Sequence, residues 1–203
     1  RSGFVDKVSW SKRNCFSIKM KKEVVSSKTI LFATGSAWKK LGVVGEEEFR
    51  NKGVHYCALC DAPLYKNKIV VVVGGGDAAA KESLLIVKYA SKVYVMARHS
   101  LKGEGVNMER VKKEKKIEVI ENINVKEIKG EKFVSRVVLD KAIRGSKEFK
   151  TDAVFVDIGH VPLSGLAVPL GVKLNKKKEI AINKESKTNI IGVITSIVVD
   201  INV

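Results

Sequence analysis

The sequence predicts an α/β protein in which a parallel sheet carrying helices is combined with an antiparallel β-meander. Residues 68–73 form a continuous apolar run, which is typical of a strand buried on both faces of a parallel sheet. Three glycines follow this run, and residues 77–89 then repeat apolar side chains at helical spacing. From residue 124 onward the apolar period changes to two, as in antiparallel strands.

The other elements follow from the same two periods and from turn residues between them. Upstream of the apolar run, strands are expected at 5–10, 15–20, 23–26 and 28–33, and a short acidic helix at 46–49. Downstream, strands are expected at 93–97, 117–120 and 153–158, a helix at 108–115, and the meander at 124–128, 133–140 and 147–150. The tail is expected to contain short strands.

The glycine turn after the apolar run fits a dinucleotide-binding motif. Gly74-x-Gly76-x-x-Ala79 follows a strand and opens a helix, which is the context that G-x-G-x-x-G/A requires. Gly74 permits the tight turn, Gly76 lets the backbone approach a pyrophosphate, and Ala79 keeps helix and strand close. The helix N-terminus adds free N–H donors. We therefore expect a Rossmann-like NAD(P)-binding unit in preference to a glycine turn without a ligand. The expected contacts are Gly74, Gly75, Gly76, Asp77, Ala78 and Ala79.

The end of the second parallel strand indicates which nicotinamide nucleotide is bound. NAD enzymes usually place a carboxylate there, which accepts a hydrogen bond from the ribose 2′-hydroxyl. This sequence instead has Arg98 and His99, with Lys102 close behind. Cations without a carboxylate favour the 2′-phosphate of NADP, because Arg can bind phosphate in a bidentate way. The alternative is a solvated loop arginine.

Cys57 and Cys60 are separated by one turn, so their sulfurs can pair when oxidised and stay adjacent when reduced. Asp61 follows directly and is available to take and give protons during exchange. The alternatives are two buried structural cysteines or a zinc half-site with His55 as a third donor. Zinc requires four ligands, however, and the sequence has no second cysteine pair. Three cysteines are too few for a disulfide scaffold and indicate a reducing compartment. A redox dithiol is therefore favoured, and no metal is expected.

Composition argues against nucleic-acid and membrane binding. The net charge is +16, but the lysines alternate with apolar residues along strands or lie in turns, as on solvated faces. Aromatic residues make up only 6 %, so stacking platforms for single strands are scarce. No apolar run is long enough to span a bilayer. We expect the excess positive charge to steer an acidic protein partner instead.

One segment thus combines a nicotinamide site with a dithiol, and flavin is the usual relay of electrons between the two. Four motifs carry a resemblance to a known family: Ala33-Thr34-Gly35-Ser36, residues 54–61, residues 73–77 and residues 158–162. They occur in the order and at the spacing of the low-molecular-weight thioredoxin reductases, which the sequence resembles over nearly its whole length.

The resemblance implies specific roles and partners. Cys60 would be the thiol nearest the flavin, Cys57 the thiol that attacks the partner's disulfide, and Asp61 the general acid/base. The implied cofactors are FAD and NADPH. The implied partner is a thioredoxin- or glutaredoxin-like protein, and the implied enzyme is a cytoplasmic homodimer.

The resemblance also implies domain boundaries. Residues 1–39 and 163–203 would be parts of an FAD-binding domain, into which an NADPH-binding domain, residues 40–162, is inserted. Ala33, Thr34, Gly35 and Gly159 would lie at the cofactor-binding crossings between them.

Two departures from the family limit what the resemblance implies. The family's N-terminal glycine fingerprint for FAD is expected to be absent, and Ile197-Val198 stands where the family has a flavin-binding Gly-Asp pair. Two alternatives stay open. One is a related flavin-dependent dithiol oxidoreductase with another electron donor or acceptor. The other is an inactive nucleotide-binding fragment that lacks FAD.

Overall fold

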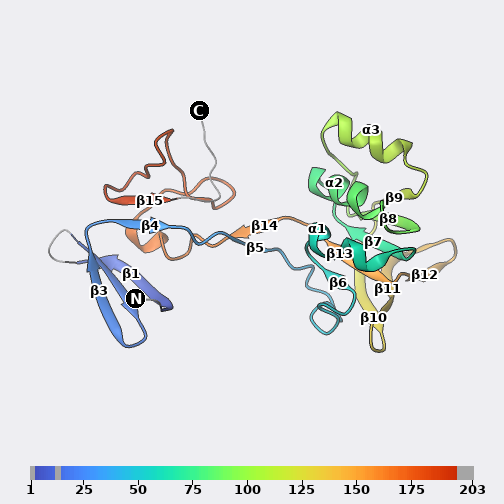
Figure 1. Cartoon of the computed structure of the whole chain (residues 1–203), viewed down its shortest axis with the longest axis horizontal. Helices are drawn as coiled ribbons and strands as arrows, with labels where there is room; N and C mark the ends of the chain where they lie inside the picture. The colour runs from blue at the N-terminus through green and yellow to red at the C-terminus, as the bar shows by residue number, and fades with distance from the viewer. Residues whose placement is uncertain (1–2, 12–14, 196–203) are drawn as a thin grey trace. The chain divides into compact units, whose positions relative to one another are not determined.

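The computed structural model describes residues 3–11 and 15–195 (Figure 1). The pair Ile197-Val198 lies outside these described residues. The chain divides into two compact units, one made of Arg1–Ala37 with His160–Val203 and the other of Trp38–Gly159. The second unit is therefore inserted, in sequence, within the first. In the part of the chain that the structure describes, no helix has the length and apolar character needed to cross a membrane.

The inserted unit is built on a five-stranded sheet whose neighbouring strands are all parallel. Its order along the sheet is β6-β13-β7-β8-β9. The bounds are Val54–His55 for β6, Ala153–Val156 for β13, Ile69–Val73 for β7, Lys92–Ala97 for β8 and Ile117–Glu121 for β9. The parallel sheet predicted from the apolar run is confirmed.

Side chains of β7 alternate between two cores, which explains why the run is apolar throughout. Val70 and Val72 pack into a core with the helices, whereas Val71 and Val73 pack into a second core with the meander. The helices α2 and α3 lie on one side of the sheet and the meander on the other (Figure 1). Their bounds are Asp77–Ile86 for α2, Gly105–Lys113 for α3, Val125–Gly130 for β10, Val134–Ile143 for β11 and Ser146–Lys150 for β12. The predicted antiparallel meander is confirmed.

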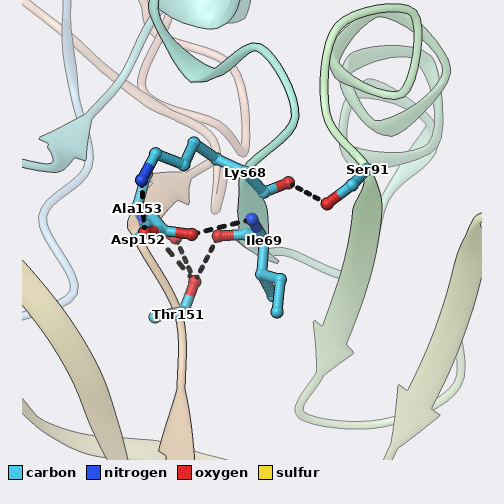
Figure 2. A network of polar contacts seen from close by, with 6 residues as sticks. All are labelled: Lys68, Ile69, Ser91, Thr151, Asp152 and Ala153. Atoms are coloured by element: carbon cyan, nitrogen blue, oxygen red, sulfur yellow. Dashed lines mark hydrogen bonds and ion pairs between the residues drawn. The ribbon is translucent and has the colours of Figure 1, made fainter.

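A polar network fixes the starting ends of the parallel strands, away from the glycine turn (Figure 2). Asp152 accepts a hydrogen bond from the Ile69 N–H at 2.9 Å and pairs with Lys68 at 3.3 Å. The Thr151 hydroxyl lies 3.1 Å from the Ile69 carbonyl oxygen, and Ser91 donates to the Lys68 carbonyl at 3.0 Å. These contacts join the amino-terminal ends of β13, β7 and β8. Because the three strands are parallel, their carboxyl ends all lie at the opposite edge of the sheet.

The other unit consists of short strands over a small core of its own. An antiparallel sheet contains β1 (Val5–Trp10), β2 (Phe16–Met20) and β3 (Glu23–Ser27). Two-stranded sheets pair β4 (Ile30–Phe32) with β15 (Val193–Thr195), and β5 (Ser36–Trp38) with β14 (His160–Pro162). Phe16, Phe32 and Leu170, which ends the 3₁₀ helix η2 (Val168–Leu170), are buried in the core.

One element predicted from the sequence is wrong. Residues 46–49 do not begin a helix but form an isolated turn. Glu46, the first residue of the predicted helix, is 2 % exposed, and its carboxylate accepts hydrogen bonds from the N–H groups of Leu41 and Gly42. Gly45 has φ +86°, a left-handed value that does not continue into a helix.

Candidate redox and nucleotide site

Cys57 and Cys60 are joined by a disulfide at the start of the short helix α1 (Ala58–Asp61). Cys57 is the N-cap residue, and its Sγ accepts a hydrogen bond from the Cys60 N–H at 3.2 Å. A sulfur placed here accepts a hydrogen bond from a backbone N–H, which stabilises a thiolate better than a thiol. Cys60 is exposed and Cys57 is partly buried. The pair is therefore open to another molecule on at least one side.

Asp61 ends α1 and belongs to a hydrogen-bonded chain of three side chains. His55 Nδ1 lies 2.9 Å from Asp61 Oδ2, and His55 Nε2 lies 2.6 Å from the hydroxyl of Tyr65. Tyr65 ends the 3₁₀ helix η1 (Ala62–Tyr65). Burial, followed by the negative charges of Asp61 and Asp152, raises the pKa of Tyr65 to about 12, so its hydroxyl stays protonated.

The glycine turn joins β7 to α2 in the way the sequence motif requires. A Cβ on Gly74 would overlap the Asp157 carbonyl oxygen and would lie 2.7 Å from Ala79 Cβ, so only glycine fits there. Gly76 is the N-cap of α2, and the space where its Cβ would lie is empty. Since no side chain caps this helix, its first N–H groups stay open to an anion. The residues present therefore fit a pyrophosphate.

The loop after β8 lies over this turn. Lys102 donates its backbone N–H to the Gly75 carbonyl at 2.9 Å. Arg98, His99 and Lys102 are all exposed. Among the described residues, Arg98 and Lys102 form no ion pair, so both cations can reach an anionic ligand at this edge of the sheet.

Asp77, the first residue of α2, ties the turn to the following helix. Its Oδ1 accepts hydrogen bonds from the Glu104 N–H at 2.8 Å and from Asn107 at 3.0 Å, while Oδ2 pairs with Lys81 at 2.7 Å. The hydrogen bond with Lys81, with those from Asn107 and Glu104, lowers the pKa of Asp77 to about 2. Asp77 thus holds the loop after β8 in place. Ala78 follows it within the first turn of α2.

Glu82 connects α2 to the dithiol helix, against which α2 packs. Its Oε2 atom is buried without a hydrogen-bond partner among the described residues. Burial, followed by the nearby charge of Asp157, raises the pKa of Glu82 to about 7, although a hydrogen bond from the Ala58 N–H acts in the opposite direction. Ala58 directly follows Cys57, so this carboxyl contacts the backbone of the dithiol motif.

The remaining expected residues lie where the chain passes between the units. Ala33, Thr34 and Gly35 follow β4, and the Thr34 hydroxyl donates to the Leu163 carbonyl at 2.7 Å. Gly35 and Gly159 have left-handed φ values of +65° and +99°, and each has empty space where a Cβ would lie. The backbone conformation at each of these two positions therefore favours glycine.

Sequence reasoning missed the buried side chains around the dithiol. His55 was considered only as a metal donor, whereas its ring nitrogens face Asp61 and Tyr65. Glu46 accepts a hydrogen bond from the Tyr56 hydroxyl at 2.8 Å, and burial together with this bond raises the pKa of Tyr56. The signal available in the sequence was His55, a polar residue between the apolar Val54 and Tyr56, whereas Glu46 begins an acidic run and is not distinguished by its neighbours.

The fold and the site together define an α/β protein of Rossmann type with a C-x-x-C disulfide on the helix beside its glycine turn. Residues 4–194 match the family described as pyridine nucleotide-disulphide oxidoreductase. The chain belongs to that family.

Thioredoxin reductases are among the relatives, which confirms the resemblance predicted from the motifs. The chain is 37 % identical over 174 residues to the thioredoxin reductase of Spironucleus barkhanus, covering 84 % of this chain and 57 % of that protein. It is also 37 % identical over 170 residues to the thioredoxin reductase of Listeria innocua, covering 82 % and 53 %. The crystal structure of Lactococcus lactis thioredoxin reductase in the FR conformation matches with a TM-score of 0.80 at 31 % identity, covering 95 % of this chain and 64 % of that one. The chain thus spans about half the length of the relatives it matches.

Proposed function

We propose that this chain is the central part of an NADPH-dependent thioredoxin-disulfide reductase. The observation that carries the proposal is the Cys57–Cys60 disulfide on a helix that packs against α2, whose N-terminus at Gly76 is open. NADPH would supply two electrons as a hydride when bound, and FAD would pass them on one pair at a time. A thioredoxin- or glutaredoxin-like protein would be the final acceptor.

Residues of this chain would bind both cofactors. The N-terminus of α2, with Gly74 and Gly76, would hold the NADPH pyrophosphate, and Arg98 would bind the 2′-phosphate with Lys102 and His99 beside it. Backbone around Gly35 and Gly159 would lie against FAD.

The dithiol would carry the electrons onward. Reduction breaks the Cys57–Cys60 bond with uptake of two electrons and two protons, and Asp61 would exchange protons with the pair. Cys57 would then attack the partner's disulfide, Cys60 would displace the partner's thiol, and the Cys57–Cys60 bond would form again.

The setting proposed for this activity is the cytoplasm, where thiols are kept reduced between turnovers. The positive net charge of +16 would attract an acidic partner protein and raise its association rate. We propose a homodimer, as the resemblance implies.

The test is turnover of a disulfide reporter coupled to thioredoxin, with NADPH and FAD supplied. Cys57→Ser should abolish turnover, whereas the matched control Cys15→Ser, which removes the free thiol, should retain it. A flavin absorption band in the purified protein would support FAD binding. Turnover that survives Cys57→Ser would overturn the dithiol assignment. Failure to bind flavin or to turn over would overturn the reductase assignment for this chain.

A further inference from the structure

The imidazole ring of His55 is buried among other side chains. It lies in β6 and is 5 % exposed, and Phe155 is its register partner on the neighbouring strand β13. The His55 and Phe155 rings stack with their centroids 5.2 Å apart, and Tyr65 packs edge-on against both rings. A buried imidazole in such a cage has one orientation, so its two nitrogens point in fixed directions.

Both ring nitrogens have partners, and the partners decide which nitrogen carries the proton. The Tyr65 hydroxyl remains a phenol at neutral pH, because burial raises its pKa to about 12, and it can donate to Nε2 at 2.6 Å. Nε2 then acts as the acceptor, which leaves the proton of a neutral ring on Nδ1. Nδ1 consequently donates to Asp61 Oδ2 at 2.9 Å. The donor order is Tyr65, His55, Asp61.

Asp61 is left with one oxygen held and one oxygen available. Oδ2 is bound to His55, whereas Oδ1 makes no hydrogen bond to any other residue that the structure describes. The Asp61 side chain is 31 % exposed, and Asp61 follows Cys60 on the same short helix. Because one oxygen is fixed by a buried ring, the carboxylate cannot rotate freely to another partner.

We propose that His55 is a positioning residue for the dithiol, which orients Asp61 so that Oδ1 exchanges protons with the Cys57–Cys60 pair. The inference rests on the proposed dithiol function and assigns two further residues to it. His55 acts through Asp61, and Tyr65 acts through His55 by fixing the ring tautomer. The arrangement resembles other sites in which a third group orients the proton-transferring one.

The test follows reoxidation of the reduced dithiol in the whole chain by the aromatic disulfide 5,5′-dithiobis(2-nitrobenzoate). A cysteine thiol gives its proton to Asp61, its thiolate attacks the reagent's disulfide, and one thionitrobenzoate leaves. The second cysteine displaces the other, so two electrons pass to the reagent, two protons are released and the Cys57–Cys60 bond forms again. All variants carry Cys15→Ser, because the free Cys15 thiol would also react with the reagent. No cofactor is needed.

A matched pair of nearly isosteric substitutions separates the hydrogen bond from packing. His55→Asn keeps an N–H donor close to the position of Nδ1, whereas His55→Leu has similar volume and no donor. We expect the Asn variant to react within about threefold of the parent and the Leu variant to react at least about tenfold slower near neutral pH. Equal rates in the two folded variants would overturn the proposal.

The pH profile provides a readout that packing alone would not change. Without an oriented Asp61, only the thiolate reacts, so the Leu variant's rate should fall about tenfold per pH unit below the thiol pKa. The parent and the Asn variant should fall less steeply, because Asp61 removes the thiol proton. A purely structural effect would lower the rate by the same factor at every pH, and that result would contradict the proposal.

Tyr65→Phe gives an independent measurement, which can be made even if the His55 variants do not fold. The substitution removes one oxygen and keeps the ring contacts with His55 and Phe155. The chain has three histidines, so the ¹⁵N spectrum of their rings can be assigned by single substitutions. We expect the His55 proton on Nδ1 in the parent and a mixture of tautomers in the Phe variant. A proton on Nε2 in the parent would overturn the proposal.

These outcomes also distinguish this inference from the proposed function. If Cys57→Ser leaves the stoichiometry and rate of the reaction unchanged, the dithiol function itself fails. If the dithiol reacts as a pair but the Asn and Leu variants share one rate and one pH profile, only the role of His55 fails.

Discussion

Gly74 packs directly against Ala79, so that a methyl group on Gly74 would lie 2.7 Å from Ala79 Cβ. The same methyl group would overlap the Asp157 carbonyl oxygen at the end of β13. The approach of β7, α2 and β13 at this point therefore depends on the absence of a side chain. This contact connects the sheet register to the open N-terminus of α2.

Gly74→Ala should destabilise the fold, because neither the Ala79 side chain nor the β13 backbone can move without disturbing the sheet. We expect a loss of about 1–3 kcal/mol in the free energy of unfolding, measured by urea denaturation. Gly76→Ala is the matched control, since the space at Gly76 is empty and its φ of −106° suits alanine. The Gly76 variant should fold normally and bind NADPH more weakly. Equal stability of the Gly74 variant and the parent would contradict this packing.

Arg98→Ala should weaken binding of NADPH and leave binding of NADH nearly unchanged, because only NADPH carries the 2′-phosphate. We expect about a tenfold loss of NADPH affinity, equivalent to about 1.4 kcal/mol, in titration calorimetry. Arg110→Ala, which removes another exposed arginine from α3, is the control for net charge. If the two variants lose NADPH affinity equally, Arg98 has no specific role.

Glu82→Gln should stabilise the protein at neutral and alkaline pH. The folded state raises the pKa of Glu82 from 4.5 to about 7, so the unfolded chain loses this proton first as the pH rises. Folding is therefore disfavoured progressively between about pH 4.5 and 7, and the penalty is complete above that range. The expected gain in the Gln variant is about 1–2 kcal/mol at pH 8, reduced from the full shift by solvent screening, and close to zero at pH 4.5.

The measurement for Glu82→Gln is the unfolding free energy as a function of pH. Glu109→Gln, an exposed carboxyl on α3, serves as the control and should show no comparable pH-dependent gain. A Gln variant less stable than the parent at pH 8 would show that the Glu82 carboxylate is stabilising.

Glu46→Gln should destabilise the segment before the dithiol. Its carboxylate accepts hydrogen bonds from Leu41, Gly42 and Tyr56, and an amide nitrogen cannot replace an accepting oxygen. One buried donor is left unpaired, which costs about 2 kcal/mol in unfolding free energy. Glu47→Gln is the neighbouring control, because the Glu47 side chain is 56 % exposed and its ion pairs are at the surface. A midpoint of urea unfolding that is equal for both variants would contradict this account.

The sequence was most informative where side chains repeat with one period over several turns or strands. The run ending at Val73 is apolar because both faces of β7 are buried, so its pattern and its structure have the same cause. The helix after it was predicted to reach Tyr89 but ends at Ile86, where the chain tightens into turns. The end of a helix depends on such local hydrogen bonds more than on periodicity.

The surroundings of the dithiol could not be predicted in the same way. Helix α1 has four residues and no apolar period, and it is stabilised by the Cys57 cap and by packing against α2. The contacts of His55 with Asp61 and Tyr65 join a strand to two consecutive short helices, so no single spacing indicates them. Glu46 was predicted to begin a helix, because the sequence does not distinguish a buried glutamate from an exposed one.

The most direct test of the central claim is a redox titration of the Cys57–Cys60 pair in the whole chain with Cys15→Ser. The protein is equilibrated in buffers with different ratios of reduced to oxidised dithiothreitol. Its free thiols are then alkylated, and the mass of the chain is measured by mass spectrometry. We predict that each chain carries either two alkyl groups or none at every buffer potential, because the two cysteines form one reversible two-electron couple while the fold is retained. Independent alkylation of Cys57 and Cys60, or reduction only when the protein unfolds, would contradict the account.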